Sequence, residues 1–173
     1  MLTSLKNKSV IVTGGTRGIG KGIAGVFAQL GARVCVIGRN EHDGVATVEA
    51  LKGGGGIATF YRGDVREQGD MEEAAATVAA IFGGVDILCA NAGIFPPVQL
   101  EEMSEGAWDD VFATNLKGML FSIKATLPHL KAQYGGPHRA HVVHHGSPHG
   151  LSWLVALRGD QSRDVGIHAH GRP

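Results

Sequence analysis

The stretch from residue 12 to 20, VTGGTRGIG, constrains the fold of this chain more than any other segment. It follows an apolar, β-branched run at residues 9–12 that has the composition of a buried strand. It leads into a helical pattern at residues 18–31, so its glycines lie at a strand-to-helix turn. Glycine lets the backbone approach a ligand closely, and a helix N-terminus attracts anions. The segment predicts a phosphate-binding turn made of Gly14, Thr16, Arg17, Gly18, Ile19 and Gly20.

Short apolar runs alternate with longer helical patterns along most of the chain. Strands are expected at residues 9–14, 32–38, 58–65, 85–93 and 140–145. Helices are expected at residues 18–31, 41–51, 70–84 and 104–136, with Asp70 and Ser104 as the caps of the last two. This alternation predicts βαβ units with right-handed crossovers. Because strands such as 10–12 are apolar on both faces, helices should cover both sides of the sheet. The expected fold is therefore α/β: a doubly wound, parallel Rossmann-type sheet, of which the chain carries the first four or five strands.

The first helix should bury one apolar face against this sheet. A period of 3.6 residues places five of its apolar side chains on one side. They are Ile19, Ile23, Val26, Phe27 and Leu30.

Composition excludes several classes of protein. Hydrophobic residues make up 43% and charged residues 18%, which is typical of a soluble globular domain. The formal net charge is +0 with scattered Lys and Arg, which argues against a nucleic-acid or anionic-membrane surface. No secretory signal and no membrane span are expected. Cys35 and Cys89 lie in apolar strands, so we expect reduced thiols rather than a disulfide or a metal site, in a cytoplasmic enzyme domain.

The composition changes after Gly136. Residues 137–173 contain seven of the nine histidines and lack Lys, Glu, Tyr and Phe. No helical period continues through them for two turns. The sequence therefore predicts a nucleotide-binding Rossmann domain at residues 1–136 and a poorly ordered, irregular tail rich in His, Gly and Arg at residues 137–173.

Four motifs, taken in order, resemble the short-chain dehydrogenase/reductase family, which includes 3-oxoacyl-[acyl-carrier-protein] reductases. They are Thr13-Gly14-x-x-x-Gly18-x-Gly20, then Asp64-Val65, then Asn91-Ala92-Gly93, and Asn115 within TNLKG. The resemblance covers roughly residues 4–136. It implies an NAD(P)-dependent oxidoreductase that reduces a small carbonyl or acyl-thioester substrate, for example in fatty acid metabolism. It also implies homo-oligomers for intact members, whose fourth and fifth helices pack across subunits.

The resemblance also assigns roles to the matching residues. Asp64 would accept a hydrogen bond from the adenine amino group, with Val65 beside the ring. Residues 91–93 would line the nicotinamide ribose. Asn115 would bend its helix and help to hold a proton-relay water, and it is the catalytic candidate. Without the family, Asp64 is as readily interpreted as a turn residue, and Asn115 as an ordinary polar residue of a helix.

Charge at the end of the second strand favours NADP(H) over NAD. NAD-binding Rossmann sites place an acid there, to accept from the ribose 2′-OH. This chain has Gly38-Arg39-Asn40 at that point, and Arg17 in the glycine turn. Two guanidinium groups suit a 2′-phosphate, to which Arg makes charge-assisted bonds. The alternative is that Arg39 is a solvated loop cation.

The proton donor of the family is missing from the sequence given. The family uses a Tyr with a Lys four residues later, which lowers the pKa of the Tyr, and a Ser that orients the carbonyl. The last Tyr here is Tyr134 and the last Lys is Lys131, in the wrong order. Ser147 is the nearest candidate for the Ser, but its surroundings do not match. A protein made of these residues should therefore catalyse little.

A change of reading frame would explain both the missing motif and the unusual tail. A GC-rich gene translated out of frame is typically rich in His, Gly, Arg and Pro. With suitable codons, residues 151–158, LSWLVALR, become YPGWSHYG one base later, which resembles the family segment before its Tyr. We hypothesise that a frameshift near Gly136 truncated the family sequence and replaced its catalytic half.

Two other interpretations stay open. The chain could be an inactive nucleotide-binding module, or a poorly folding fragment whose fifth strand is an exposed sheet edge. The tail could instead bind Zn²⁺ or Ni²⁺ through imidazoles. We favour this least, because no Cys or carboxylate joins those histidines. They are His138, His141, His144, His145 and His149.

Overall fold

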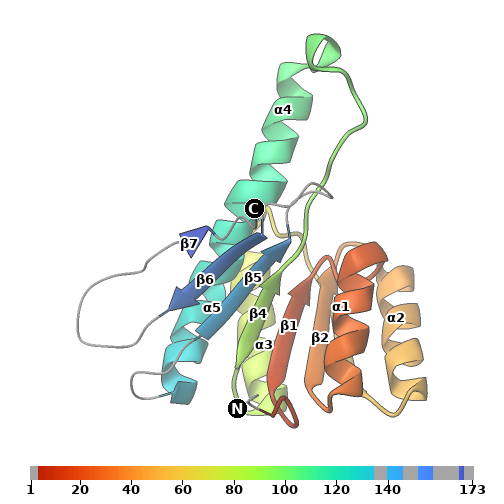
Figure 1. Cartoon of the computed structure of the whole chain (residues 1–173), viewed down its shortest axis with the longest axis vertical. Helices are drawn as coiled ribbons and strands as arrows, with labels where there is room; N and C mark the ends of the chain where they lie inside the picture. The colour runs from red at the N-terminus through yellow and green to blue at the C-terminus, as the bar shows by residue number, and fades with distance from the viewer. Residues whose placement is uncertain (1–3, 135–139, 146–151, 158–167, 170–173) are drawn as a thin grey trace.

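A computed structural model describes residues 4–134, 140–145, 152–157 and 168–169 of the chain (Figure 1). Strands and helices alternate over most of it. The first part comprises β1 (Ser9–Thr13), α1 (Gly18–Gln29), β2 (Arg33–Gly38), α2 (Glu41–Gly53), β3 (Ile57–Arg62), α3 (Gln68–Phe82) and β4 (Ile87–Ala90). The second part comprises η1 (Leu100–Glu102), α4 (Glu105–Phe112), η2 (Ala113–Lys117), α5 (Gly118–Tyr134), β5 (Ala140–His145), β6 (Ser152–Leu157) and β7 (His168–Ala169).

The strands form one sheet in the order β3-β2-β1-β4-β5-β6-β7. β1 pairs in parallel with β2 on one side, Val10 opposite Val34, and with β4 on the other, Val10 opposite Ile87. The chain moves outward from β1 in one direction through β2 and β3, and then returns to the other side of β1 with β4. This reversal creates a crevice at the carboxyl ends of β1 and β4, where open α/β sheets bind their ligands. The expected α/β fold with a parallel, doubly wound sheet is confirmed.

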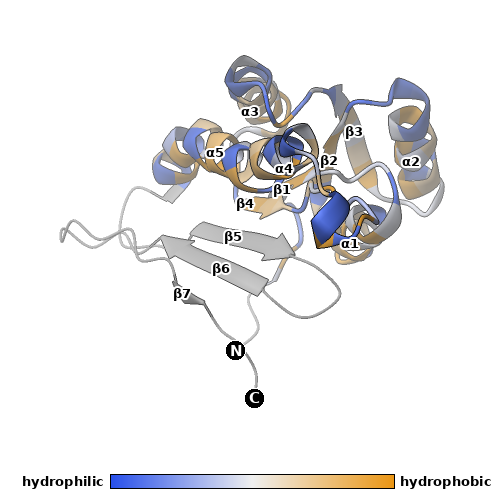
Figure 2. Ribbon diagram, turned by 90° about the horizontal axis from the view of Figure 1, so that it is seen from above, coloured by the Kyte–Doolittle hydropathy of each residue, from blue (hydrophilic) through white to orange (hydrophobic). Residues whose placement is uncertain are grey.

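Helices cover both faces of the sheet, as Figure 2 shows from above. α1 and α2 lie on one face, where they pack on Val10 and Val12 of β1. α3 and α5 lie on the other, where they pack on Ile11. Alternate residues of the central strand thus enter two separate cores, which explains why Val10, Ile11 and Val12 are all apolar.

The face that α1 buries differs from the expected one. Three of the five expected core residues are about half exposed: Ile19, Val26 and Leu30. Ile23 and Phe27 do pack against the core. The fully buried positions are small: Gly20, Ala24 and Ala28. Small side chains let the helix axis lie close to the sheet, so the apolar period pointed to the wrong side.

The two cysteines are free and buried, as expected from their strands. Cys35 belongs to the core under α3 and α5, and Cys89 to the core under α1 and α2. They therefore lie on opposite faces of the sheet. Burial raises the pKa of each thiol to about 12, which leaves almost no thiolate at neutral pH.

We expect neither thiol to react with a disulfide reagent at pH 8 while the chain is folded. Both should react within seconds in denaturant, because the thiolate is the nucleophile and unfolding restores its ordinary pKa. Titration with Ellman's reagent, with and without guanidinium chloride, makes the measurement. Fast labelling of Cys35 or Cys89 in the native chain would contradict the burial described above.

Two details of the predicted helices are wrong. Asp70 does not cap α3, because the helix already begins at Gln68. The Asp70 carboxylate lies in the first turn and accepts the backbone N–H of Asp64 at 2.8 Å, so it orders the preceding loop instead. The expected helix at 41–51 continues to Gly53. Ser104 caps α4 as predicted, accepting the N–H of Ala107 at 3.2 Å.

The expected long helix at residues 104–136 is confirmed, since α4, η2 and α5 follow one another without a break from Glu105 to Tyr134, but it is not regular throughout. The π-helical turn η2 separates α4 from α5. In Figure 1, α4 extends beyond the carboxyl edge of the sheet, away from the other helices. The distortion falls on Asn115, where the resemblance implies a local bend. The wider turn lets the Asn115 side chain bond to another segment, as described below.

Beyond Gly136, three strand segments are described. β5 pairs in parallel with β4, as the sequence suggested. β6 pairs antiparallel with β5, and β7 with β6, and neither was expected from the sequence. β5 is therefore not a sheet edge, contrary to the expectation for a poorly folding fragment. The predicted disorder of the tail otherwise concerns residues outside the described ones.

None of the helices within residues 4–134 is both long enough and apolar enough to cross a bilayer.

Candidate functional site

The glycine-rich turn joins β1 to α1 and is packed closely between β2 and the first turn of α1. The N–H of Gly14 donates to the carbonyl of Ile37 on β2 at 2.8 Å. Gly20 lies directly against this turn, so a Cβ there would collide with the Gly14 carbonyl oxygen and the Asn91 Nδ2. Only glycine permits this approach of helix to turn.

The N-terminus of α1 opens toward the crevice. Arg17 at the N-cap makes no side-chain capping bond, and the first turn of the helix contains no acidic residue. Gly18 has φ +54, and the space where its side chain would lie is open. Backbone N–H groups and the positive end of the helix dipole therefore face a region that an anion can enter. This is the geometry expected of a phosphate-binding turn.

Asn91 ties the end of β4 to the glycine turn. Its Nδ2 donates to the carbonyls of Thr13 at 3.1 Å and Gly14 at 3.3 Å. The N–H of Ala92 donates to Thr13 Oγ1 at 3.1 Å. These bonds join the two strands that flank the crevice, so the turn and the segment after β4 hold each other in place.

Asn115 connects η2 to the same segment after β4. Its Oδ1 accepts the N–H of Ile94 at 2.8 Å, and its Nδ2 donates to the Ile94 carbonyl at 2.9 Å. The two bonds pair the amide with a single backbone residue. The side chain thereby positions the loop that carries Gly93, whereas its expected contact with a water stays a prediction.

Asp64, after β3, is surrounded by positive charge. Its carboxylate accepts from Arg66 Nη2 at 2.7 Å and from Arg66 Nε at 3.0 Å, and Arg39 Nη1 is 3.8 Å away. Burial alone would raise the pKa of Asp64. The hydrogen bonds and charge of Arg66, with a contribution from Arg39, outweigh it and hold the pKa below its ordinary value. Asp64 is therefore ionised at neutral pH.

The segment after β2 forms the rim next to the glycine turn. Asn40 caps α2 by accepting the N–H of Asp43 at 3.0 Å. Thr47, fully buried in α2, donates its hydroxyl to the carbonyl of Thr16 at 2.8 Å. Arg39 is mostly exposed, with 63% of its side chain accessible. α2 thus fixes one side of the glycine turn and leaves the guanidinium of Arg39 at the entrance.

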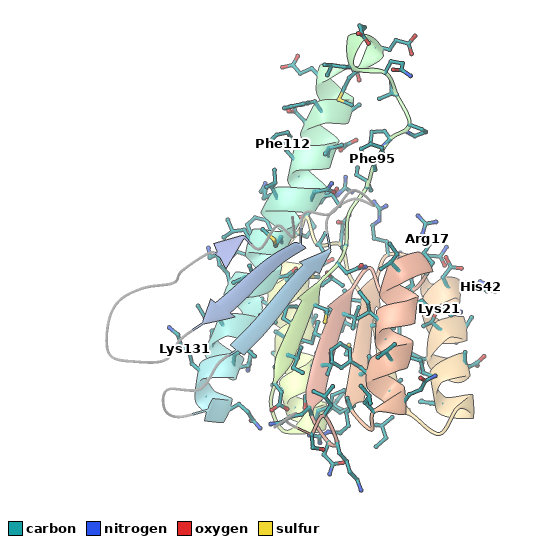
Figure 3. The ribbon with its side chains drawn as sticks, viewed as in Figure 1. Arg17, Lys21, His42, Phe95, Phe112 and Lys131 are labelled. Atoms are coloured by element: carbon teal, nitrogen blue, oxygen red, sulfur yellow. The ribbon has the colours of Figure 1, made fainter. Side chains whose placement is uncertain are left out.

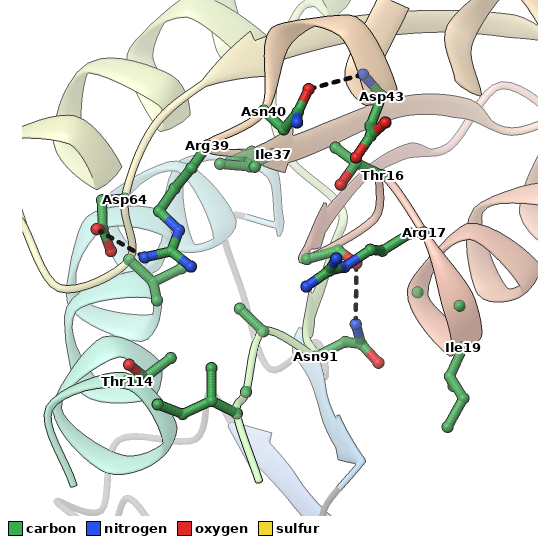
Figure 4. Close-up of a pocket in the computed structure, with 18 of the residues that line it drawn as sticks. Thr16, Arg17, Ile19, Ile37, Arg39, Asn40, Asp43, Asp64, Asn91 and Thr114 are labelled. Atoms are coloured by element: carbon green, nitrogen blue, oxygen red, sulfur yellow. Dashed lines mark hydrogen bonds and ion pairs between the residues drawn. The ribbon is translucent and has the colours of Figure 1, made fainter. Parts of the chain in front are cut away.

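These features surround one open cavity of about 760 Å³ (Figure 4). In Figure 4 the start of α1, with Arg17 and Ile19, lies on one side of it, and Asp64 and Thr114 lie on the other. All of the site residues expected from the sequence line it. They are Gly14, Thr16, Arg17, Gly18, Ile19, Gly20, Arg39, Asp64, Val65, Asn91, Ala92, Gly93 and Asn115.

Other residues that line the cavity were not singled out from the sequence. They are Ile37, Asp43, Gly63, Ile94, Phe95 and Thr114, whereas Gly38 and Asn40, which also line it, belong to the segment used above to predict the cofactor. Most of them are adjacent in sequence to a motif residue or to that segment, and this adjacency is the one signal from which they could have been predicted. Phe95 is 83% exposed on the loop after β4, and Figure 3 shows it above the carboxyl edge of the sheet, on the same side as Arg17. No composition or periodicity marked it.

Among the side chains that the structure describes, no group of three or more His, Cys, Asp and Glu residues could hold a metal ion. The side chains of the histidines proposed as alternative ligands lie outside the described residues, so that interpretation is not tested.

Comparison with known proteins agrees with the motifs. The family model described as short chain dehydrogenase matches residues 8–155, and so continues past the expected boundary at residue 136. A 3-oxoacyl-[acyl-carrier-protein] reductase from Chlamydia pneumoniae is 40% identical over 133 residues, which are 76% of this chain and 54% of that protein.

Relatives with other names match over a similar span. An L-fucose dehydrogenase from Rattus norvegicus is 38% identical over 129 residues, 74% of this chain and 46% of the relative. A D-beta-hydroxybutyrate dehydrogenase from Cupriavidus necator is 34% identical over 148 residues, 85% of this chain and 55% of the relative. The chain thus spans about half the length of the curated relatives it matches. The match of the family model to most of the sequence shows that the chain belongs to the short-chain dehydrogenase/reductase family.

Proposed function

We propose that this chain is the cofactor-binding part of an NADP(H)-dependent oxidoreductase that acts on a carbonyl group. The observation that supports this best is the cavity at the switch point between β1 and β4. Residues from four separate sequence motifs line it, although they lie up to a hundred positions apart. Convergence of such distant segments on one cavity is expected of a binding site.

The shape of the cavity fits an extended dinucleotide. The pyrophosphate would lie at Gly18 and the N-terminus of α1, where open space meets unpaired helix N–H groups. The adenine would lie beside Asp64 and Val65, and the nicotinamide ribose beside residues 91–93. These assignments follow the family resemblance, and the residues concerned all line the cavity.

Charge on the rim supports NADP(H) rather than NAD. Arg39 and Arg17 both line the cavity, and Gly38 occupies the end of β2 where an acid would select NAD. Asp43 also lines the rim and is the acid here that would favour a ribose 2′-OH. Measured affinities for NADPH and NADH therefore show whether the two arginines or Asp43 have the larger effect on cofactor choice.

A reduced nicotinamide bound here would supply a hydride to the carbon of a carbonyl group. Asn115 would position the loop beside it through Ile94, and Phe95 would offer an apolar surface to a substrate. Related proteins are named for 3-oxoacyl, L-fucose and D-beta-hydroxybutyrate substrates. A 3-oxoacyl thioester is our first candidate for this chain.

The resemblance also supports a proposal that the intact protein is a homo-oligomer. Along α4, η2 and the start of α5, exposed apolar side chains recur every four residues, on one side of the helix. They are Trp108, Phe112, Leu116 and Leu120. Such a stripe fits packing against a second subunit.

We expect the purified chain to bind NADPH reversibly and to show no turnover. The helix N-terminus and the arginines hold the cofactor, whereas the sequence has no Tyr followed four residues later by Lys. Titration of NADPH fluorescence measures binding, and NADPH oxidation with acetoacetyl thioester measures turnover. A parallel titration with NADH reports the preference.

A chain that unfolds cooperatively but binds neither NADPH nor NADH would refute this proposal. Turnover above the no-protein rate would show that another group donates the proton. Binding of both cofactors with equal Kd would retain the dinucleotide site and reject NADP(H) selectivity.

A further inference from the structure

Arg66 is a charged residue beside the cavity that the family motifs do not include. It lies two residues after Asp64, in the loop between β3 and α3, and it does not line the cavity. Besides the two side-chain bonds described above, its backbone N–H donates to Asp64 Oδ1 at 3.0 Å. Its Nη1 lies 3.5 Å from Asp110 on α4. Arg66 is thus held on both sides, and Asp64 is its main partner.

Asp64 has a second guanidinium within reach. Arg39 Nη1 lies 3.8 Å from Asp64 Oδ2, at longer range than the 2.7 Å contact of Arg66 with the same oxygen (Figure 4 marks the Arg39 pair). The side chain of Arg39 is 63% exposed, whereas that of Arg66 is 36% exposed. Arg66 therefore holds the carboxylate closely, and Arg39 is held loosely at the cavity entrance.

These two contacts compete for one negative charge. A carboxylate that is already paired with two nitrogens of one guanidinium attracts a second guanidinium weakly. Without Arg66, the unbalanced charge of Asp64 would draw Arg39 into a close pair. That pair would turn Arg39 away from the ribose end of the cavity and cancel its charge.

We propose that Arg66 determines cofactor specificity by neutralising Asp64, which leaves Arg39 free to bind a ribose 2′-phosphate. The inference rests on the proposed function, because it concerns how the same cavity selects NADP(H) over NAD. Arg66 acts through Asp64 and Arg39 and touches no cofactor atom, so it is a positioning residue. Its effect should fall on the 2′-phosphate and spare the parts that the two cofactors share.

The test is the ratio of the Kd for NADH to the Kd for NADPH, measured by isothermal titration at low ionic strength, where screening is weak. We expect Arg66→Gln to lower this ratio about tenfold, mainly by weakening NADPH binding. A residue with a merely structural role would weaken both cofactors equally and leave the ratio unchanged. A thermal melt of each variant confirms that it is folded.

Arg62→Gln is the matched control, since it removes the same charge nearby. Arg62 is the last residue of β3, lies 4.0 Å from Glu41 and does not line the cavity. We expect the ratio to stay within about twofold of wild type, because the Arg62–Glu41 pair is solvent-exposed on both sides and such pairs contribute little. An equal fall in Arg62→Gln and Arg66→Gln would overturn the proposal in favour of a general charge effect.

The double variant Asp64→Asn/Arg66→Gln provides a second, independent test. With Asp64 neutral, nothing draws Arg39 away, so the ratio should return to near the wild-type value even though both affinities fall. This comparison also serves if Arg66→Gln alone fails to fold. A ratio that stays low in the double variant would overturn the proposal. If the wild-type chain binds neither cofactor, the proposed function fails first, whereas binding with an unchanged ratio in Arg66→Gln rejects only this inference.

Discussion

Replacing Gly20 by alanine is expected to weaken NADPH binding strongly and to destabilise the fold. The added methyl group would meet the Gly14 carbonyl oxygen, which belongs to the backbone, and the Asn91 Nδ2, which is held by its bonds to the carbonyls of Thr13 and Gly14. Neither partner is a flexible side-chain end, so α1 or the glycine turn must shift. Overpacking of this kind costs about 1–3 kcal/mol, and we expect the upper end of that range. A displaced helix N-terminus should weaken NADPH binding by about 100-fold, since positioned N–H groups supply the anion site.

Gly22 offers a matched control for that substitution. It lies two residues further along α1, is exposed, and has no heavy atom within 4 Å of where a Cβ would be. Gly22→Ala should stabilise the helix by up to about 1 kcal/mol and leave NADPH binding unchanged. Urea denaturation gives the free energies of unfolding, and fluorescence titration the affinities. If Gly20→Ala bound NADPH as tightly as Gly22→Ala, the close approach of helix and turn would have no functional role.

The second large effect is expected from Asn91→Asp, which changes the shape of the side chain very little. The Asn91 amide donates to the carbonyls of Thr13 and Gly14, so the substitution places a carboxylate oxygen against two carbonyl oxygens. Two bonds are lost and a repulsion replaces them, which should cost about 3 kcal/mol at pH 7. The deficit should shrink toward pH 5, where a protonated carboxyl group can donate one bond. Urea denaturation at both pH values tests this expectation.

Asn40→Asp is the same chemical change at a position where it should be harmless. The Asn40 side chain accepts the N–H of Asp43 at the start of α2, and a carboxylate accepts there equally well. Its charge also suits a helix N-terminus, so we expect a change of stability within about 0.5 kcal/mol. A loss at Asn40→Asp as large as at Asn91→Asp would mean that charge, rather than the lost donor, explains the second prediction.

The fold of this protein followed from local patterns. Strand and helix periods identified five strands in their parallel pairing, and the glycine turn located the switch point beside β1. Those patterns indicate which side chains of a segment are buried, and they can be recognised within that segment alone. The composition of α1 shows their limit. Its apolar period suggested a buried face with Val26 and Leu30, whereas the sheet accepts the face with Ala24 and Ala28, because small residues allow close packing.

The candidate site was located from motifs, but its internal contacts were not. Asn91 bonds to Thr13 across 78 positions of sequence, and Arg66 reaches Asp110 across 44. Within the π-helical turn, the Asn115 side chain bonds to Ile94, 21 residues earlier. No local period contains such information. Asp70 illustrates the same point, since the residue type suggested a helix cap and the Asp64 N–H became its partner instead.

The sequence by itself determined the order of the strands and helices from β1 to β5, the parallel pairing of those strands, the family and the place of the glycine-rich turn. All of these depend on hydrophobic period, β-branching and the conformational freedom of glycine, which act over a few residues. Only the tertiary structure decided which face of α1 is buried, which backbone segment Asn115 bonds to, and which guanidinium holds Asp64. These outcomes depend on distances between segments far apart in the chain, and such distances exist only once the two cores have packed.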